Sequence, residues 1–509
     1  MTADAFRGRP MDSSTTIGST ESRDAVLVAG LIVIALVLRF WHLGDWNFQA
    51  TEMFTLRDSV KLKVNNPRPL GYILNYYLVR PFHPLDEFGL RLLPALFGVL
   101  AVPAVYLIGR RLVGSRAALC AGLLVTVSPL QVMYSQLARY WSLVFLLSAI
   151  YPYALYLGIR DRSRGWLALG ILTAALAALA HPVSVLLVGG LLLFLVTSLR
   201  REELARYWNP KVVWRFAVPA LAVLGLVLMH FLPVLQGWIR MHDRSRGFGQ
   251  FLRPAQPVQG LRQLVYLSIY VESLTVPVVL GALIGVYWLW QSRDRSVARL
   301  LICLALFHVG FLTLLTLRTS ASQYYLLPAV PIFYLTAGYF VDQLFRTDTP
   351  FRPRWVLPTF VLLTAIAFGA PTLVSDLREG RRYDFRGAAR WLVARVSPAD
   401  IVYSDQPMVT AHYLPEHEVR HLRKDLSLLT GAMDQLRQDG RGGALWLVVP
   451  APSHAYRPNL KEGGMINWIY GHCWLRSSTG VGRVDFRQDY LHIYYCRPSA
   501  SPEVPPPSR

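Results

Sequence analysis

A series of apolar runs, each long enough to cross a membrane, constrains this chain more than any other feature. The first, Ala25 to Leu43, stays in place as an anchor because no small-residue cleavage site follows it. Ten further runs of about 18 to 22 residues are centred near Leu100, Val125, Ala149, Leu176, Leu191, Leu224, Leu280, Leu306, Phe333 and Thr364. We therefore predict a polytopic α-helical membrane protein with about eleven spans, and its 53% hydrophobic and 16% charged residues agree with that class.

The basic residues of the predicted loops indicate how the chain crosses the membrane. They gather in alternate loops, and the positive-inside rule places these loops and the polar N-terminal tail, residues 1–24, in the cytoplasm. The residues are Arg110, Arg111, Arg116, Arg160, Arg162, Arg164, Arg200, Arg201, Arg206, Lys211, Arg215, Arg293, Arg295, Arg299, Arg346, Arg352 and Arg354. An odd number of spans then exports the C-terminal region, and we expect the protein in the inner (plasma) membrane.

The formal net charge of +21 does not indicate a nucleic-acid-binding protein. The basic residues are interspersed between apolar runs and are not gathered on one amphipathic helix or finger. Cytoplasmic loops and anionic lipid head groups account for them better. We predict membrane lipids, and no nucleic acid, among the partners.

A small soluble domain is predicted after the membrane domain of residues 25–375. Helical spacing at residues 385–396 and 425–436 alternates with short apolar strands at 401–403 and 444–449, and a β-rich end follows at 484–495. This alternation predicts a small α/β domain over residues 376–498. The proline-rich tail, residues 499–509, is predicted to be disordered.

The four cysteines fall into two pairs. Cys120 and Cys303 lie in predicted spans, whereas Cys473 and Cys496 lie in the exported domain, where thiols can oxidise, so we predict a disulfide between them. The sequence has no CxxC pair, Walker loop or GxSxG elbow, which leaves P-loop NTPase and α/β-hydrolase functions unsupported. It also has no dedicated cluster of metal ligands, so we predict no cofactor, and a divalent metal stays an open alternative.

The first outer loop, residues 44–89, holds three carboxylates close to a span. Asp45, Glu52 and Asp58 are either solvated loop charges or candidate bases held where lipid meets water. The charge of the loop alone does not decide between these two interpretations.

Several segments occur in an order and spacing that resemble a known family. They read RFWHLGDWNFQATEMFTL, PRPLGYIL, GLRLLPALFGVLAVPAVYLIGRRLVG, SPLQVMYSQLARYWSL, an AHP turn, SQYYLLPAVPIFYLTAGY and YDFRGAARWL. Over roughly residues 25–415 the chain resembles the GT-C membrane glycosyltransferases, in the group that contains the family 39 protein mannosyltransferases, the lipid A aminoarabinose transferases and the RgtA/B/C/D-like enzymes.

This resemblance implies a polyprenyl-phosphate sugar donor, an acceptor at the outer face and inversion at the anomeric carbon. The acceptor class stays open between a glycolipid, a polysaccharide and a protein. In such enzymes the first outer loop carries an Asp-Glu pair, with the Asp as candidate base, but here the pair is Thr51 and Glu52. A hydroxyl cannot replace a carboxylate near neutral pH. We predict Glu52 as the base, with Asp45 and Asp58 as alternatives.

The chemistry itself also requires these residue types. Glycosyl transfer from a lipid phosphate needs a base for the proton of the acceptor hydroxyl, and cations for the phosphate as negative charge moves onto it. Because phosphate is a good leaving group, one essential carboxylate is enough. Partial desolvation at the membrane interface raises the pKa of a carboxylate, which suits a base.

Arg139 in QLARYW is the predicted phosphate ligand, because it interrupts an apolar and aromatic stretch at the outer end of a span. A buried arginine is costly unless paired, and its planar fork matches phosphate oxygens; the alternative is a side chain that snorkels to the interface. Further substrate-binding candidates are Arg68 and Tyr72 of an altered Pro-Pro-Leu element, and Tyr140, His181, Arg318, Gln323 and Tyr324. For His181 the alternative is a structural role at a helix end, and for Gln323 and Tyr324 an interfacial aromatic belt.

Two other classes of function remain. A transporter would place paired ionisable residues near the bilayer midplane, whereas here they gather at loop ends. A catalytically silent relative that binds a lipid-linked sugar, or scaffolds glycan assembly, is favoured by the missing Asp at Thr51.

Overall fold

The computed structural model describes residues 17–64, 66, 68–198, 274–292, 295–316, 323–347, 353–380, 383–422, 425–440, 442–450, 464–480 and 490–497. The chain forms two compact units. Unit 1 comprises Met1–Leu43 and Asp58–Leu373, and unit 2 comprises Gly44–Arg57 and Val374–Arg509.

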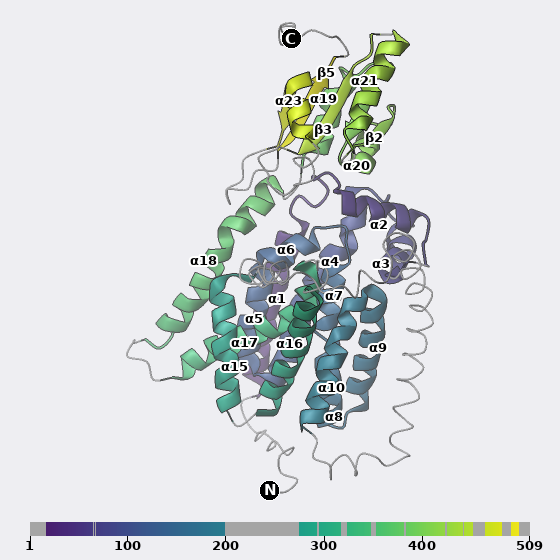
Figure 1. Ribbon diagram of the computed structural model, residues 1–509. Coiled ribbons are helices and arrows are strands. Elements are labelled where there is room, and N and C mark those ends of the chain that lie inside the picture. The colour runs from purple at the N-terminus through teal and green to yellow at the C-terminus, as the bar shows by residue number, and fades with distance from the viewer. Residues whose placement is uncertain are drawn as a thin grey trace. The chain divides into compact units, whose positions relative to one another are not determined.

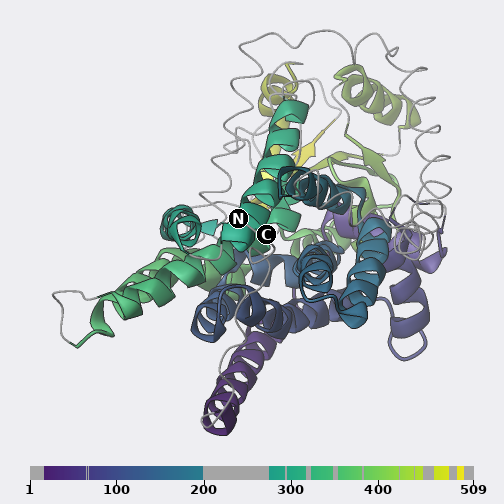
Figure 2. The ribbon, with the colours of Figure 1, turned by 90° about the horizontal axis from the view of Figure 1, so that it is seen from below.

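Unit 1 is a bundle of helices, many of which run alongside one another (Figures 1 and 2). Neighbouring pairs include α8 with α9, α10 with α16, and α15 with α17. The helices are α1 (Ile17–Phe40), α3 (Pro69–Leu74), η2 (Asn75–Val79), α4 (Glu87–Leu112), α5 (Ser115–Val127), α6 (Pro129–Ser135), α7 (Trp141–Ser148), α8 (Tyr151–Arg160), α9 (Arg164–Ala180), η3 (Pro182–Val185), α10 (Leu186–Ser198), α15 (Val276–Gln291), α16 (Arg295–Thr316), η6 (Gln323–Ala329) and α17 (Val330–Arg346). Two more, α2 (Ala50–Val60) and α18 (Val356–Glu379), each contribute residues to both units.

The prediction of a polytopic membrane protein is confirmed. Among the described residues, 5 helices are long and apolar enough to cross a membrane, and the bent pair α5 and α6 would make 6. Every predicted span centre lies in a helix or at the turn between α7 and α8, except Leu224, which is outside the described residues. The total of about eleven spans therefore stays a prediction.

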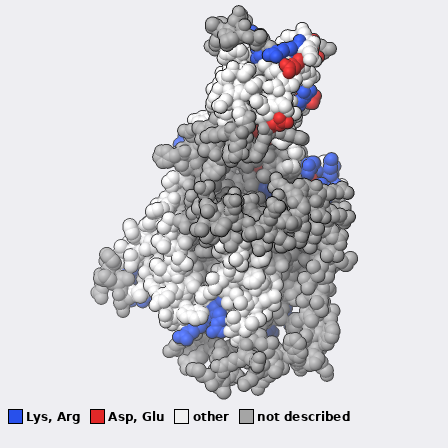
Figure 3. Space-filling model, in the orientation of Figure 1, with Lys and Arg blue, Asp and Glu red and all other residues white. Residues whose placement is uncertain are grey.

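Large apolar side chains cover the outside of unit 1. Val196, Phe360 and Leu314 are 75%, 66% and 66% exposed. On the face drawn in Figure 3, the described surface of this unit is largely free of charged side chains. Such a surface is stable only where lipid, and not water, contacts it.

Polar side chains set where several helices begin. The Asp86 carboxylate accepts the Gly89 N–H at 2.8 Å at the start of α4, and Ser163 accepts the Trp166 N–H at 3.4 Å at the start of α9. α1 begins at Ile17, inside the segment predicted as a tail, and Asp24 on this helix accepts hydrogen bonds from Ser115 and Tyr106. These bonds explain why the helix extends beyond its apolar run.

Unit 2 contains a five-stranded sheet in the order β2-β1-β3-β5-β4. β1 is parallel to β2 and β3, whereas β5 is antiparallel to β3 and β4. The strands are β1 (Ile401–Ser404), β2 (Val419–His421), β3 (Leu445–Pro450), β4 (Cys473–Thr479) and β5 (Leu491–Cys496), and the helices are α19 (Phe385–Val393), α20 (Pro407–Tyr413), α21 (Ser427–Asp439) and α23 (Met465–His472). The predicted small α/β domain is confirmed, although the strands β2 and β4 were not predicted.

The segment Gly44–Arg57 of the first predicted outer loop is part of unit 2. The Asn47 side-chain amide donates to the Tyr383 carbonyl at 2.9 Å, and the Phe48 N–H donates to the Tyr413 hydroxyl at 2.7 Å. Phe48 is fully buried, with its ring 5.4 Å from that of His412. These contacts are distant in sequence, so the apolar pattern of the loop did not reveal them.

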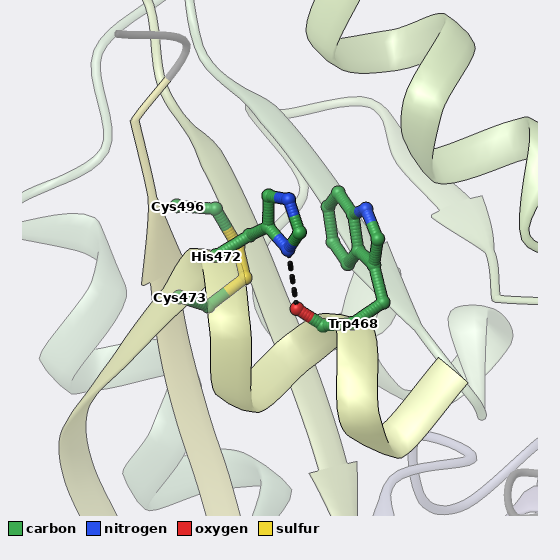
Figure 4. The surroundings of a disulfide bond; sticks show 4 residues. All are labelled: Trp468, His472, Cys473 and Cys496. Atoms are coloured by element: carbon green, nitrogen blue, oxygen red, sulfur yellow. Dashed lines mark hydrogen bonds between the residues drawn. A yellow bond between two sulfur atoms is a disulfide. The ribbon is translucent and has the colours of Figure 1, made fainter. Parts of the chain in front are cut away.

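The predicted disulfide between Cys473 and Cys496 is confirmed. The two cysteines are directly opposite each other on β4 and β5, with their Cα atoms 4.2 Å apart. Figure 4 shows the bond at the end of α23, where His472 Nδ1 donates to the Trp468 carbonyl at 2.9 Å and the two rings stack. The disulfide ties the edge strand β4 to the sheet.

Replacing Cys473 and Cys496 together by Ala should loosen this edge of unit 2. Cross-linking a loop of 23 residues stabilises a fold by about 3 kcal/mol. We expect faster amide hydrogen exchange in β4 and β5, measured by mass spectrometry. The double replacement of the buried free thiols Cys120 and Cys303 is the control, and equal exchange in both variants would contradict the prediction.

Candidate functional site

Asp58, Asn66 and Tyr72 form a connected polar group before and within α3 of unit 1. The Asn66 side-chain amide donates to Asp58 Oδ2 at 3.1 Å and to the Tyr72 hydroxyl at 3.2 Å. Asp58 and Tyr72 are 3% and 4% exposed. α3 begins at Pro69, whose fixed φ and missing N–H suit a first helical position. The loop is therefore folded back on itself by one amide.

A second segment, between α6 and α7, carries Arg139 and Tyr140. The Tyr140 ring lies edge-on to the Tyr72 ring, with 5.1 Å between centroids. It also packs directly on the backbone of Gly71, where an added Cβ would lie 1.8 Å from a ring carbon. Only glycine allows this approach, so the two segments meet at this pair.

Three charged side chains act on the Tyr72 hydroxyl. Burial raises the pKa of Tyr72 above its ordinary value, Arg139 lowers that pKa, Asp58 raises it, and Arg68 lowers it. Arg139 and Arg68 are both partly buried. The structure thus brings together four residues that the sequence predicted separately: Arg139 from the α6–α7 connection, and Asp58, Arg68 and Tyr72 from the first loop.

His181, at the break between α9 and η3, is held neutral. Its Nδ1 accepts the Val183 N–H at 3.1 Å, which leaves the ring proton on Nε2. Burial lowers the pKa of His181 well below its ordinary value, and the positive charges of Arg68 and Arg139 lower it further. The Nε2–H is buried and has no acceptor among the described residues, so it is a donor available to a ligand.

An aromatic group lies beside His181. The Trp141 ring centroid is 4.6 Å from that of His181 and 4.4 Å from that of Tyr324. The Tyr325 ring centroid is 5.5 Å from that of His181. The Tyr325 carbonyl accepts a hydrogen bond from His308 Nε2 at 2.8 Å, which holds η6 against α16. This wall presents apolar ring faces next to two cations.

The carboxylates predicted as catalytic are divided between the two units. Asp58 is in unit 1 with Arg68 and Arg139, whereas Asp45 and Glu52 are in unit 2. Asp45 is exposed and Glu52 is fully buried. Glu52 Oε2 accepts the Gln49 N–H at 2.9 Å at the start of α2, in the arrangement of a capping box. Thr51, at the position where the family resemblance implies Asp, is exposed.

Two predicted ligands cannot be placed fully. Arg318 lies outside the described residues, and Gln323 is the first residue of η6. Sequence reasoning missed Trp141 and Asn66, although Trp141 stands two residues after Arg139 in the stretch that marked the site. No group of three or more His, Cys, Asp and Glu side chains in the described parts of the chain is arranged to hold a metal ion.

A separate pocket of about 260 Å³ lies in unit 2, before the starts of β1, β2 and β3. Asp400, which lines it, accepts the Ala444 N–H at 2.7 Å and the Trp446 indole N–H at 3.0 Å. Glu418 pairs with Arg420 at 3.2 Å. Asp400 joins the start of β1 to β3, and the pocket is lined by one arginine, Arg420, and by no Phe, Tyr or Trp side chain, unlike the unit 1 cluster.

Comparison with known proteins agrees with this architecture. The family model described as dolichyl-phosphate-mannose-protein mannosyltransferase matches residues 71–235. ArnT from Cupriavidus metallidurans in the apo state is 14% identical, with a TM-score of 0.54 over 94% of this chain and 98% of that one. The chain has the GT-C fold.

Two further GT-C structures were solved with a lipid phosphate. ArnT bound to undecaprenyl phosphate is 13% identical, with a TM-score of 0.52 over 96% of this chain and 100% of that one. Archaeal oligosaccharyltransferase AglB from Archaeoglobus fulgidus, in complex with an inhibitory peptide and a dolichol-phosphate, is 12% identical, with a TM-score of 0.57 over 91% and 74%. No curated protein matches the chain in sequence. The resemblance inferred from the order of the motifs is thus confirmed as a GT-C fold.

Replacing Gly71 by Ala should force the Tyr140 ring out of place. The added methyl group would overlap the ring at 1.8 Å, and overpacking of this kind costs about 1–3 kcal/mol. We expect the apparent melting temperature in detergent, followed by tryptophan fluorescence, to fall by several degrees. Gly310→Ala is the control, because an added Cβ there meets nothing within 4 Å; equal melting of both variants would argue against the contact.

Proposed function

We propose that this protein is a membrane glycosyltransferase that moves a sugar from a polyprenyl-phosphate donor to an acceptor hydroxyl. One observation carries the proposal: in a GT-C fold, two arginines and a neutral histidine donor converge with an aromatic wall in unit 1. ArnT with undecaprenyl phosphate and AglB with dolichol-phosphate support a lipid phosphate as the ligand.

The arginines suit the phosphate of the donor. One guanidinium group can donate two parallel hydrogen bonds to two phosphate oxygens. Its charge also stabilises the leaving phosphate as that group gains negative charge. The neutral His181 Nε2–H adds one directed hydrogen bond. Trp141 and Tyr324 offer ring faces against which a sugar can pack. Arg139 and Arg68 are therefore the proposed phosphate ligands.

Glu52 is the proposed base. An inverting transfer needs a carboxylate that takes the proton of the acceptor hydroxyl as this hydroxyl attacks the anomeric carbon. Glu52 is fully buried at the start of α2, where the helix dipole favours its negative charge. Asp58 is bonded by Asn66, and we assign it the role of holding Tyr72.

The reaction is proposed to take place on the extracytoplasmic face of the inner membrane. The positive-inside pattern supports this orientation, and the Cys473–Cys496 disulfide suits an oxidising compartment for unit 2. The acceptor is a glycolipid, a polysaccharide or a protein at that face.

Paired amide substitutions test the base. Glu52→Gln keeps size and hydrogen bonding but removes the proton acceptor, so we expect transfer to fall by about 10² to 10⁴ while undecaprenyl phosphate binding is unchanged. Asp58→Asn keeps an oxygen for Asn66 and should retain most activity. Mass spectrometry of lipids and glycans from cells with each variant gives the readout, and the reverse ranking would transfer the role to Asp58.

Arg139→Ala should weaken undecaprenyl phosphate binding by about tenfold to a hundredfold, as expected for a lost charged hydrogen bond of roughly 1.5–3 kcal/mol. Titration calorimetry on the full-length protein in nanodiscs measures the change. Arg111→Ala, an exposed arginine at the end of α4, is the control. Equal binding by wild type and Arg139→Ala would refute the phosphate role.

A catalytically silent GT-C protein is the second candidate, because Thr51 replaces the Asp of the resemblance and is exposed. The same experiments separate the two. Binding of the lipid phosphate without any glycan or lipid product that depends on Glu52 would favour the silent protein.

A further inference from the structure

The end of α1 meets the end of α5 in the interior of unit 1. The last carbonyls of an α-helix have no partner within the helix, and lipid supplies none. α5 ends at Val127, where the chain bends by 57° into α6, and α1 ends at Phe40. Both ends therefore need donors from elsewhere in the chain.

The end of α5 receives donors from the last turn of α1, and the end of α1 receives donors from the segment that follows α5 and α6. Arg39, in the last turn of α1, donates to the Val125 carbonyl at 3.0 Å and the Thr126 carbonyl at 3.1 Å. Gln136, directly after α6, donates to the Leu38 carbonyl at 3.2 Å and the Trp41 carbonyl at 2.9 Å. The two caps are reciprocal, so neither helix end can shift without breaking the other.

The surrounding helices pack closely around these two capping side chains. Arg39 is fully buried and Gln136 is 5% exposed. A Cβ added to Gly98 of α4 would lie 2.0 Å from Ser135 Oγ and 2.9 Å from Arg39 Nε. At the other end of the segment, the Tyr334 hydroxyl of α17 donates to Ser128 Oγ at 2.6 Å. Residues 128 to 136 are thus fixed at both ends.

Arg139 follows Gln136 by three residues, and its N–H bonds the Leu137 carbonyl at 2.6 Å in a tight turn. We propose that Arg39 and Gln136 are positioning residues that hold Arg139 where it grips the lipid phosphate. The inference rests on the proposed function, because it assumes that Arg139 binds this phosphate. The caps touch no substrate and act through the backbone of the segment that ends in Arg139.

Gln136→Ala is the more informative variant, because it removes one cap and leaves the buried Arg39 paired with α5. Arg39→Lys is the second variant: it keeps the positive charge but lacks the fork that reaches two carbonyls. The matched control is Gln131→Ala on α6. Gln131 is as buried as Gln136, at 2% exposed, and among the described residues it makes no hydrogen bond to α1.

The test measures the binding of undecaprenyl phosphate, and of undecaprenol without phosphate, to the full-length protein in nanodiscs. We expect Gln136→Ala and Arg39→Lys to weaken undecaprenyl phosphate binding about tenfold, or ~1.4 kcal/mol. Undecaprenol binding should stay constant, as should both affinities in Gln131→Ala. In the double variant Gln136→Ala/Arg139→Ala, binding should be no weaker than in Arg139→Ala alone.

The double variant separates positioning from general destabilisation. Independent effects add, whereas a residue that acts only through Arg139 loses its effect once Arg139 is gone. Additive losses, or unchanged binding in Gln136→Ala when Arg139→Ala is impaired, would overturn this inference and leave the proposed function intact. Unchanged binding in Arg139→Ala itself would overturn both.

Discussion

The buried guanidinium of Arg39 is the interaction on which the rest of unit 1 depends. A fully buried arginine is costly in a membrane protein, and so are uncapped carbonyls at a helix end. Placed between α1 and α5, the two terminal nitrogens of Arg39 donate to the Thr126 and Val125 carbonyls. These hydrogen bonds offset the free-energy cost of the unpaired carbonyls at the bend between α5 and α6. The chain can then turn into the segment that carries Arg139 and Tyr140.

The candidate site is built where helices are interrupted. Arg139 lies between α6 and α7, His181 separates α9 from η3, Tyr324 is in the 3₁₀ turn η6, and Tyr72 is in α3, next to a π-helical turn. In a regular helix the backbone N–H and C=O groups bond one another. At a break, polar groups are left that can bond a ligand. Gly71 then lets two of these breaks touch through the Tyr140 ring. Helix breaks are costly in a membrane, and here they place the polar groups of the candidate site.

Unit 2 combines its sheet with a short segment from the first predicted outer loop. A disulfide joins its edge strand β4 to β5, and the unit includes the segment Gly44–Arg57 through Asn47 and Phe48. As a result, the carboxylates of one short loop have different surroundings: Glu52 caps α2 in unit 2, and Asp58 is bonded by Asn66 in unit 1. Carboxylates that are close in sequence are thus held by different partners.

The sequence by itself determined the class of this protein, most of its helices, the α/β domain and the disulfide, because hydropathy, spacing and compartment are local or compositional properties. It also marked Arg139, Arg68, Tyr72 and His181 singly, as polar residues at the ends of apolar runs. Only the tertiary structure decided that their charges act on one another, that Trp141 and Asn66 join them, and that Gln136 and Arg39 cap each other's helices. Such contacts join residues that are far apart in sequence, 98 positions for Gln136 and Leu38, and they depend on how helices pack, which no local pattern encodes.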